Sequence, residues 1–295
     1  MERLYDKLKA YSESDFYAFH MPGHKRNKAL LGIELPYDLD ITEIDGFDDL
    51  HHADGILKEE QERAARVFGA EESHFLVNGS TAGILSAVMG CTHRGDKILV
   101  ARHCHKSIYH AIYMNGLVPR YVYPEFDISM HMNGEISKED VAKALAAEPD
   151  IKAVVIVSPN YDGVVSDVKG IAEVAHSYRI PLIVDEAHGP HFGFHPAFPG
   201  RANDLGADVV INSLHKTLPS LTQTAILHIN GKIVNRRRIK KYLDMLQSSS
   251  PSYIFMASLD ACVDFVDGKC ENAFELYVER LQKFREELEP LQHLQ

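Results

Sequence analysis

The sequence lacks a long apolar run, because each apolar stretch is interrupted by a charged residue, a glycine or a proline. A helix that crosses a membrane needs about 20 consecutive, mostly apolar residues, so we expect no membrane-spanning segment. The first residues, M-E-R-L-Y-D-K-L-K-A-Y, are amphipathic and charged and lack the apolar core of a signal peptide. We therefore do not expect export.

The sequence is also poor in cysteine and in positive charge. Its four cysteines are too sparse for a disulfide framework and form no C-x-x-C pair, which favours a reducing cytoplasm. A net charge of −11 argues against nucleic acid as a partner. The one basic run, residues 236–241, falls in a predicted helix and is interpreted as a solvated or interface face, with an anion contact as the alternative.

What the sequence does contain is a series of short β-rich runs separated by helical patterns. The predicted strands are 73–78, 97–101, 120–123, 153–157, 181–185, 208–212 and 223–229. The predicted helices between them are 80–91, 105–115, 138–147 and 167–178. This alternation predicts an α/β fold with a mostly parallel seven-stranded sheet sandwiched by helices. The connection between the last two strands is short for a parallel crossover, so an antiparallel strand is expected there.

The two ends of the sequence have a different pattern. Residues 20–56 contain many turn formers and little periodicity, which predicts an irregular arm after a first helix. From about residue 231 onward helical patterns dominate, and residues 271–288 carry apolar positions at helical spacing. His20 and His24 have the spacing of metal ligands on a helix, but Pro22 and Gly23 break that helix, so the segment is interpreted as a rigid turn.

Polar residues follow the predicted strands at the ends where ligands bind in open α/β sheets. After strand 73–78, Gly79 allows a tight turn, and Ser80 and Thr81 open a helix. They form either a phosphate site at a helix N-terminus or an ordinary N-cap. The spacing of a P-loop is absent.

After strand 97–101 come His103, Cys104 and His105. Their spacing is poor for a shared zinc ion, and no second pair of ligands follows, so no metal is expected. The imidazole of His105 is either structural or stacks on a flat aromatic ligand.

Two later strands end in charged residues. Asp185 ends an otherwise apolar strand and needs a partner, because an unpaired buried carboxylate is strongly destabilising. It could serve as a helix cap, as half of a salt bridge, or as the partner of a protonated ring nitrogen. Lys216 follows strand 208–212 beside His215, and is either a surface lysine or a functional amine.

Taken together, these strand ends match the four chemical handles of pyridoxal 5'-phosphate. The hydroxyls suit its phosphate, the imidazole its ring face, the carboxylate its pyridinium nitrogen, and the lysine its aldehyde.

Several longer stretches resemble the Orn/Lys/Arg decarboxylase family, bacterial decarboxylases of basic amino acids with the aspartate aminotransferase-like fold. In the order of the family these stretches are F-H-M-P-G-H-K (19–25), F-L-V-N-G-S-T-A-G (75–83), R-H-C-H-K-S (102–107), S-P-N-Y-D-G (158–163), V-D-E-A-H-G-P-H-F-G-F (184–194), S-L-H-K-T-L-P-S-L-T-Q (213–223) and S-S-S-P-S-Y-I-F-M-A-S-L-D (248–260). The pair D-E-A-H-G and S-x-H-K-T-L is the most specific part.

The resemblance implies a role for each matching residue. Lys216 bonds to the cofactor aldehyde, and Asp185 pairs with the ring nitrogen. His105 stacks on the ring, and His188 lies close to the ring and the substrate. The implied phosphate ligands are Ser80, Thr81, Ser213 and His215.

The resemblance also implies an activity and an assembly. The expected reaction is decarboxylation of arginine, lysine or ornithine to CO₂ and the amine, as in polyamine biosynthesis. Ser248 and Ser249 are expected to reach the phosphate of a neighbouring subunit, which implies a homodimer or higher homo-oligomer with its active site at the interface. The alternatives are another pyridoxal-phosphate activity, such as that of an aminotransferase or lyase, and a truncated non-catalytic homologue.

Two departures from the family pattern bear on these expectations. S-P-N-Y-D-G replaces S-P-T-Y-x-G, which changes the surroundings of Asn160 and Asp162. The family continues into a C-terminal small domain, whereas this sequence stops at Gln295, so a short form or a fragment is expected. The expected division is an N-terminal helix and arm (1–50), a cofactor-binding large domain (51–250), and the helical start of a truncated small domain (251–295).

Overall fold

A seven-stranded sheet forms the centre of the computed structural model, which describes residues 2–29 and 31–291. The strand order is β1-β9-β8-β7-β6-β2-β3. The strands are β1 (Glu72–Leu76), β2 (Lys97–Ala101), β3 (Val118–Val122), β6 (Ile151–Val157), β7 (Leu182–Asp185), β8 (Val209–Asn212) and β9 (Ala225–Ile229). Each coincides with a predicted strand to within a few residues.

One strand runs against the others. β9 pairs antiparallel with both β1 and β8, whereas β2, β3, β6, β7 and β8 are joined in parallel. The connection before β9, residues 213–224, contains only the four-residue helix α7, whereas a parallel crossover usually contains a full helix. The predicted antiparallel strand is confirmed.

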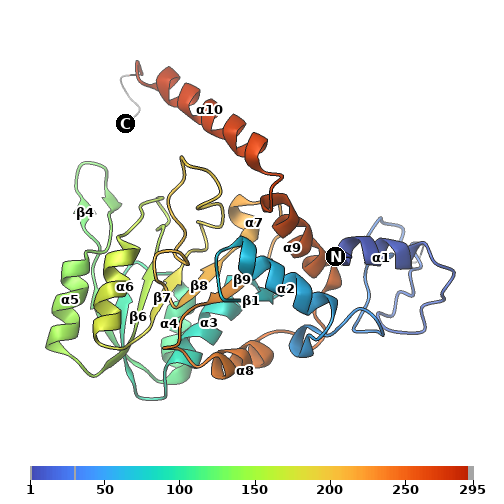
Figure 1. The fold of residues 1–295 in the computed structure, drawn as a ribbon, viewed down its shortest axis with the longest axis horizontal. Coiled ribbons are helices and arrows are strands. Elements are labelled where there is room, and N and C mark those ends of the chain that lie inside the picture. Colours follow the sequence, from blue (N-terminus) through green and yellow to red (C-terminus); the bar gives the residue numbers. More distant parts are fainter. Residues whose placement is uncertain (1, 30, 292–295) are drawn as a thin grey trace.

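Helices cover both faces of the sheet, as predicted (Figure 1). The helices α3 (Gly79–Cys91), α4 (Lys106–Asn115) and α8 (Arg236–Leu246) pack on one face, and α5 (Lys138–Ala147) and α6 (Val168–Ser177) pack on the other. In β2, Ile98 and Val100 face the first layer while Leu99 and Ala101 face the second. Because both faces are buried, the strand reads as a continuous apolar run.

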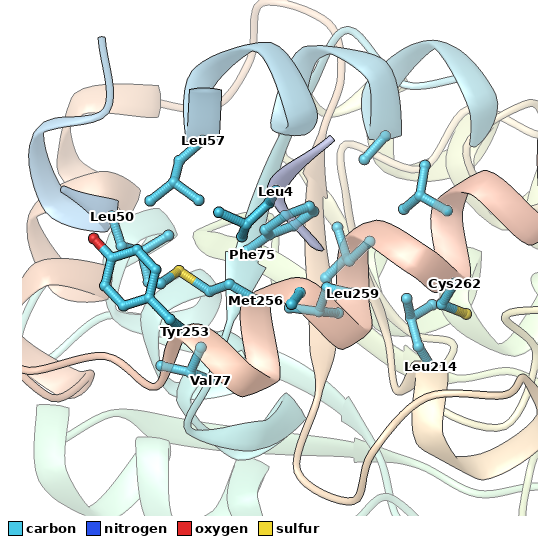
Figure 2. Close-up of a cluster of buried hydrophobic side chains, with 14 of the residues drawn as sticks. Leu4, Leu50, Leu57, Phe75, Val77, Leu214, Tyr253, Met256, Leu259 and Cys262 are labelled. Carbon is cyan, nitrogen blue, oxygen red and sulfur yellow. The ribbon is translucent and has the colours of Figure 1, made fainter. Parts of the chain in front are cut away.

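A third apolar core joins the two ends of the chain (Figure 2). It lies between α1 (Leu4–Ser12), α2 (Ile56–Val67), β1 and α9 (Tyr253–Val266). Leu4, Leu57, Phe75 and Leu259 are fully buried there. The helix α9 therefore packs with N-terminal elements, although it lies beyond the predicted boundary at residue 250. The domain division itself stays a prediction.

The remaining elements are short or lie at the edge of the molecule. They are η1 (Leu50–His52), the hairpin of β4 (Phe126–Asp127) and β5 (Met132–Asn133), α7 (Leu214–Thr217) and α10 (Glu271–Leu288). The sequence patterns missed α2, this hairpin and the single turn of α7. In Figure 1, α10 extends away from the rest of the molecule beyond α9, and Phe274 is its one buried residue among those described. Within the described ranges, no helix is long and apolar enough to cross a membrane.

Candidate active site

The parallel strands bring their carboxyl ends to one edge of the sheet, and a cavity of about 740 Å³ opens there. Loops that follow β1, β2, β6, β7 and β8 supply most of its wall. The lining residues are Asn78, Gly79, Ser80, Thr81, His103, Cys104, His105, Lys106, Val157, Tyr161, Asp185, Ala187, His188, His215, Lys216, Thr222 and Gln223. Seven of the ten residues predicted for the site are therefore gathered around one cavity.

One end of the cavity is the N-terminus of α3. Gly79 has a φ of +74°, a conformation that glycine adopts without strain, and it turns the chain from β1 into the helix. Ser80 and Thr81 follow in the first helical turn, which contains no acidic residue. Asn78 makes no side-chain cap, so the first backbone N–H groups are left for another acceptor. This arrangement suits an anion.

The predicted phosphate ligands from the β8 loop differ in their surroundings. His215 Nδ1 lies 2.8 Å from the carbonyl oxygen of Thr224, which fixes the orientation of the ring. Ser213 is fully buried, and its Oγ has no hydrogen-bond partner within the described residues. A buried hydroxyl without a partner is costly, so a ligand oxygen there would stabilise it.

A lysine and a histidine that line the cavity are in contact. Lys216 Nζ lies 3.0 Å from His188 Nε2. Burial lowers the pKa of Lys216, while Asp185 acts in the opposite direction. Burial and the nearby Lys216 lower the pKa of His188. A neutral imidazole can thus accept a hydrogen bond from the lysine ammonium.

Asp185 forms the buried end of the cavity and is only 2% exposed. Burial raises the pKa of its carboxyl to about 6, against the lowering effects of the Ala187 N–H and of Lys216. In the part of the chain that the structure describes, Ala187 N–H donates the one hydrogen bond to this carboxylate, at 3.2 Å. The site therefore has room for a further positive partner at Asp185.

His105 and His103 flank the cavity from the loop after β2. His105 caps α4: its Nδ1 accepts from the Ser107 N–H at 3.3 Å and lies 2.8 Å from Ser107 Oγ. His103 also lines the cavity, and its Nδ1 is buried without a partner among the described residues. Sequence reasoning considered His103 only as a metal ligand. Its position two residues after a strand end was the signal that could have included it.

Sequence reasoning also missed a buried link between two of the loops. Glu186 and Asn212 are 3% and 1% exposed. The Asn212 side-chain amide donates to Glu186 Oε2 at 3.0 Å and to the Glu186 carbonyl at 3.1 Å, and the Ala202 N–H donates to Glu186 Oε1 at 2.8 Å. This link joins the loop of Asp185 and His188 to the strand end that precedes Lys216.

Three predicted residues do not line the cavity. Ser213 is fully buried, and Ser248 and Ser249 are exposed. The Ser248 N–H donates to Asn78 Oδ1 at 3.2 Å, so this segment adjoins the outer end of the cavity. The expected contact with a neighbouring subunit stays a prediction.

The histidines of the N-terminal arm are held by other contacts. His24 lies 3.2 Å from Asp40 and stacks on Tyr37, and His20 lies 2.8 Å from the Tyr11 hydroxyl. Across the described residues, no group of three His, Cys, Asp or Glu side chains is arranged to hold a metal ion.

Comparison with known proteins places this architecture in a family. The family model described as "Orn/Lys/Arg decarboxylase, major domain" matches residues 3–295. An uncharacterized Bacillus subtilis protein, YaaO, is 42% identical over 269 residues, which cover 89% of this chain and 56% of YaaO. An arginine decarboxylase of the same bacterium is 39% identical, over 87% of this chain and 54% of that enzyme.

Solved structures agree with the sequence comparison. Lysine decarboxylase A from Pseudomonas aeruginosa superposes with a TM-score of 0.86 at 27% identity, covering 100% of this chain and 44% of that one. The Escherichia coli constitutive lysine decarboxylase gives a TM-score of 0.85 at 25% identity, covering 98% of this chain and 44% of that one. The chain thus spans about half the length of the curated relatives it matches.

Proposed function

We propose that this chain, which belongs to the Orn/Lys/Arg decarboxylase family, binds pyridoxal 5'-phosphate and removes the carboxyl group of a basic L-amino acid as CO₂. The observation that carries the proposal is the contact of Lys216 with His188 in the same cavity as the buried Asp185. Relatives named arginine decarboxylase and lysine decarboxylase support arginine, lysine or ornithine as the substrate class.

The residues present fit this cofactor at each of its four handles. The open first turn of α3 with Ser80 and Thr81 suits the phosphate, and His105 offers a flat face at the cavity wall. The carboxylate of Asp185 and the amine of Lys216 suit the ring nitrogen and the aldehyde. When bound, the cofactor supplies an electron sink for the electron pair released as CO₂ leaves.

The side chains of the chain itself would control binding and protons. Ionised Asp185 holds the ring nitrogen in its protonated form, because an adjacent negative charge favours the positive state. His188 would accept a hydrogen bond from Lys216 and orient its amine toward the cofactor aldehyde, and burial favours the neutral, nucleophilic form of that amine. Lys216 and His188 are also the groups within reach to return a proton to the substrate carbon. His215 lines the cavity and would hold the phosphate from the β8 side, whereas the buried hydroxyl of Ser213 would have to open to the cavity to join it.

Chemical trapping tests the cofactor site directly. Purified protein is incubated with pyridoxal 5'-phosphate, reduced with borohydride and digested, and the peptides are analysed by mass spectrometry. We expect the phosphopyridoxyl group on Lys216 and no specific label in Lys216→Ala. Labelling spread over surface lysines, unchanged in that variant, would refute the site.

Product analysis then tests the reaction. The loaded protein is given L-arginine, L-lysine and L-ornithine, and CO₂ and amines are measured. A keto acid or an aldehyde fragment in place of CO₂ would indicate an aminotransferase or another lyase. Cofactor on Lys216 with no product from any substrate would favour the non-catalytic alternative.

We further propose a homodimer with the active site at its interface. Phe16, Tyr17, Phe19 and Met21 on the N-terminal arm are 64–88% exposed, which is unusual for large apolar side chains of a monomer. The exposed Ser248 donates from its N–H to Asn78, which lines the cavity, and the exposed Ser249 follows it in the chain. Light scattering should give twice the chain mass, and Ser249→Ala should weaken cofactor binding without changing that mass.

We also propose that residues 51–250 form the cofactor-binding domain between the arm (1–50) and a helical segment (251–295), and that the protein acts in the cytoplasm in polyamine biosynthesis. The four cysteines are free thiols, and three of them are buried, which suits a reducing compartment. Limited proteolysis tests the division: cleavage is expected near residues 50 and 250 before any within the sheet.

A further inference from the structure

A basic substrate carries a positive charge at the end of its side chain, and the proposed cofactor site does nothing to neutralise it. Of the described residues that line the cavity, Asp185 is the only carboxylate, and its buried place beside Lys216 commits it to the cofactor ring. The basic side chains that line the cavity are His103, His105, Lys106, His188, His215 and Lys216. A wall of this composition repels a second cation unless an acid lies at its mouth.

The loop of residues 160–163 between β6 and α6 supplies such an acid. Tyr161 lines the cavity, is 88% exposed, and meets the ring of His188 edge-on with 5.8 Å between the ring centres. Asp162 follows directly and is exposed. Its negative charge reaches the cavity wall, because it opposes the effect of burial on the pKa of His103. Asp162 is thus the next residue after a lining residue, on a loop whose Tyr161 packs edge-on against His188.

The buried side chain of Asn160, which is 2% exposed, holds the loop in place. Its Oδ1 accepts from the N–H groups of Asp162 and Val164, each at 2.9 Å. Its Nδ2 donates to the carbonyl of Asn133 in β5 at 2.8 Å. These three contacts fix the backbone that presents Asp162, so little conformational entropy is lost when a ligand binds to it.

The carboxylate of Asp162 has no ion-pair partner in the described parts of the chain, although the backbone around it is fixed. A carboxylate carried on a fixed backbone can pair with the fork of a guanidinium or the donors of an ammonium group. The exposed ring of Tyr161 beside it gives the aliphatic part of such a side chain an apolar surface.

We propose that Asp162 binds the terminal ammonium or guanidinium group of the substrate and thereby selects basic over neutral amino acids. This inference rests on the proposed function, because it assumes that the amino acid is bound at Lys216. It also assigns a role to the loop in which this sequence departs from the S-P-T-Y-x-G pattern.

Paired ligands that differ only in charge test the proposal. The full chain loaded with pyridoxal 5'-phosphate is titrated with L-lysine and its neutral analogue L-norleucine, and with L-arginine and L-citrulline, while the absorbance of the cofactor is followed. We expect Asp162→Asn to weaken the affinity for lysine and arginine about tenfold, the loss typical of one charged hydrogen bond. Affinity for the neutral analogues should stay unchanged.

Two further variants separate the charge from the fold. Asp162→Glu keeps the carboxylate and should retain most of the preference for basic ligands. Glu173 on α6 is exposed, so Glu173→Gln removes the same charge from the surface of the helix that follows this loop and should change no affinity.

Two outcomes would overturn the proposal, and they distinguish failure of the role of Asp162 from failure of the proposed function. Equal losses for lysine and norleucine, or none for either, would refute the role of Asp162 alone. Failure of wild-type and variant alike to take up the cofactor at Lys216 would refute the proposed function and this inference with it.

Discussion

Lys216 Nζ lies 3.0 Å from His188 Nε2, although the two residues are 28 positions apart in the sequence. They come from the loops after β8 and β7, which pair in parallel and therefore end at the same edge of the sheet. Burial lowers the pKa of both groups, and each also lies in the field of other basic side chains or of Asp185. Burial thus favours the neutral form of both groups, and at 3.0 Å the lysine amine can donate a hydrogen bond to the neutral imidazole.

We predict that His188→Ala slows covalent attachment of pyridoxal 5'-phosphate to Lys216 on the order of a hundredfold at pH 7, because the amine loses the hydrogen-bond acceptor that orients it. Stopped-flow absorbance measures this rate. His110→Ala on the exposed surface of α4 is the matched control and should attach the cofactor at the wild-type rate. Equal rates in both variants would show that His188 does not act on the lysine.

Cofactor affinity should rise with pH through about 6. Burial raises the pKa of Asp185 to about 6, and only its ionised form pairs with the protonated ring nitrogen. Below that pH the carboxyl is neutral, so the dissociation constant should increase about tenfold for each pH unit. Equilibrium titrations from pH 5 to pH 8 measure it. Asp185→Asn should bind weakly and lack this dependence, and a wild-type profile in that variant would contradict the assignment.

Stability should also respond to pH through a buried acid pair far from the active site. Glu60 in α2 and Asp260 in α9 are fully buried, and Arg63 hydrogen-bonds to both. Burial first, and Asp260 second, raise the pKa of Glu60 to about 7. The cluster also includes Asp264, which is more exposed and forms ion pairs with both Arg63 and Arg3.

The sign of that response follows from the direction of the shift. A carboxyl whose pKa is higher in the folded state binds protons on folding, so its contribution is fully present below its unfolded pKa of about 4.5 and is lost as pH rises through about 7. The free energy of unfolding from urea titrations should therefore fall across this range. Glu60→Gln should flatten the profile, whereas Glu59→Gln on the exposed side of α2 should not.

The contact between α3 and α8 leaves no space for a side chain at Gly90. A Cβ there would lie 2.6 Å from Ile239 Cγ1 and 2.9 Å from Ile239 Cα. Because one of these atoms is backbone, the helices must move apart, and Gly90→Ala should lower the free energy of unfolding by about 1–3 kcal/mol. Gly23→Ala, whose Cβ would meet no atom within 4 Å, is the control. An unchanged melting temperature in Gly90→Ala would show that the helices tolerate the shift.

The sequence by itself determined the strands, their alternation with helices, and the polar residues at the strand ends. These are local properties: an apolar run bounded by turn formers predicts a buried strand wherever it occurs, and the carboxyl ends of parallel strands share one edge. Ser80, Thr81, His105, Asp185, His188, His215 and Lys216 could therefore be assigned to one site before their distances were known.

Only the tertiary structure decided which further side chains contact one another, at the cavity and elsewhere, and how burial affects their charge. The link between Glu186 and Asn212, the place of His103 and Tyr161 in the cavity wall, and the pair of Glu60 and Asp260 all join segments far apart in the sequence. Their effects depend on burial, which sets the cost of a charge or an unpaired donor, and burial is a property of the packed chain. The single turn of α7 is too short to give a periodic pattern, whereas α2 consists largely of strong helix formers and was missed although its local pattern favours a helix.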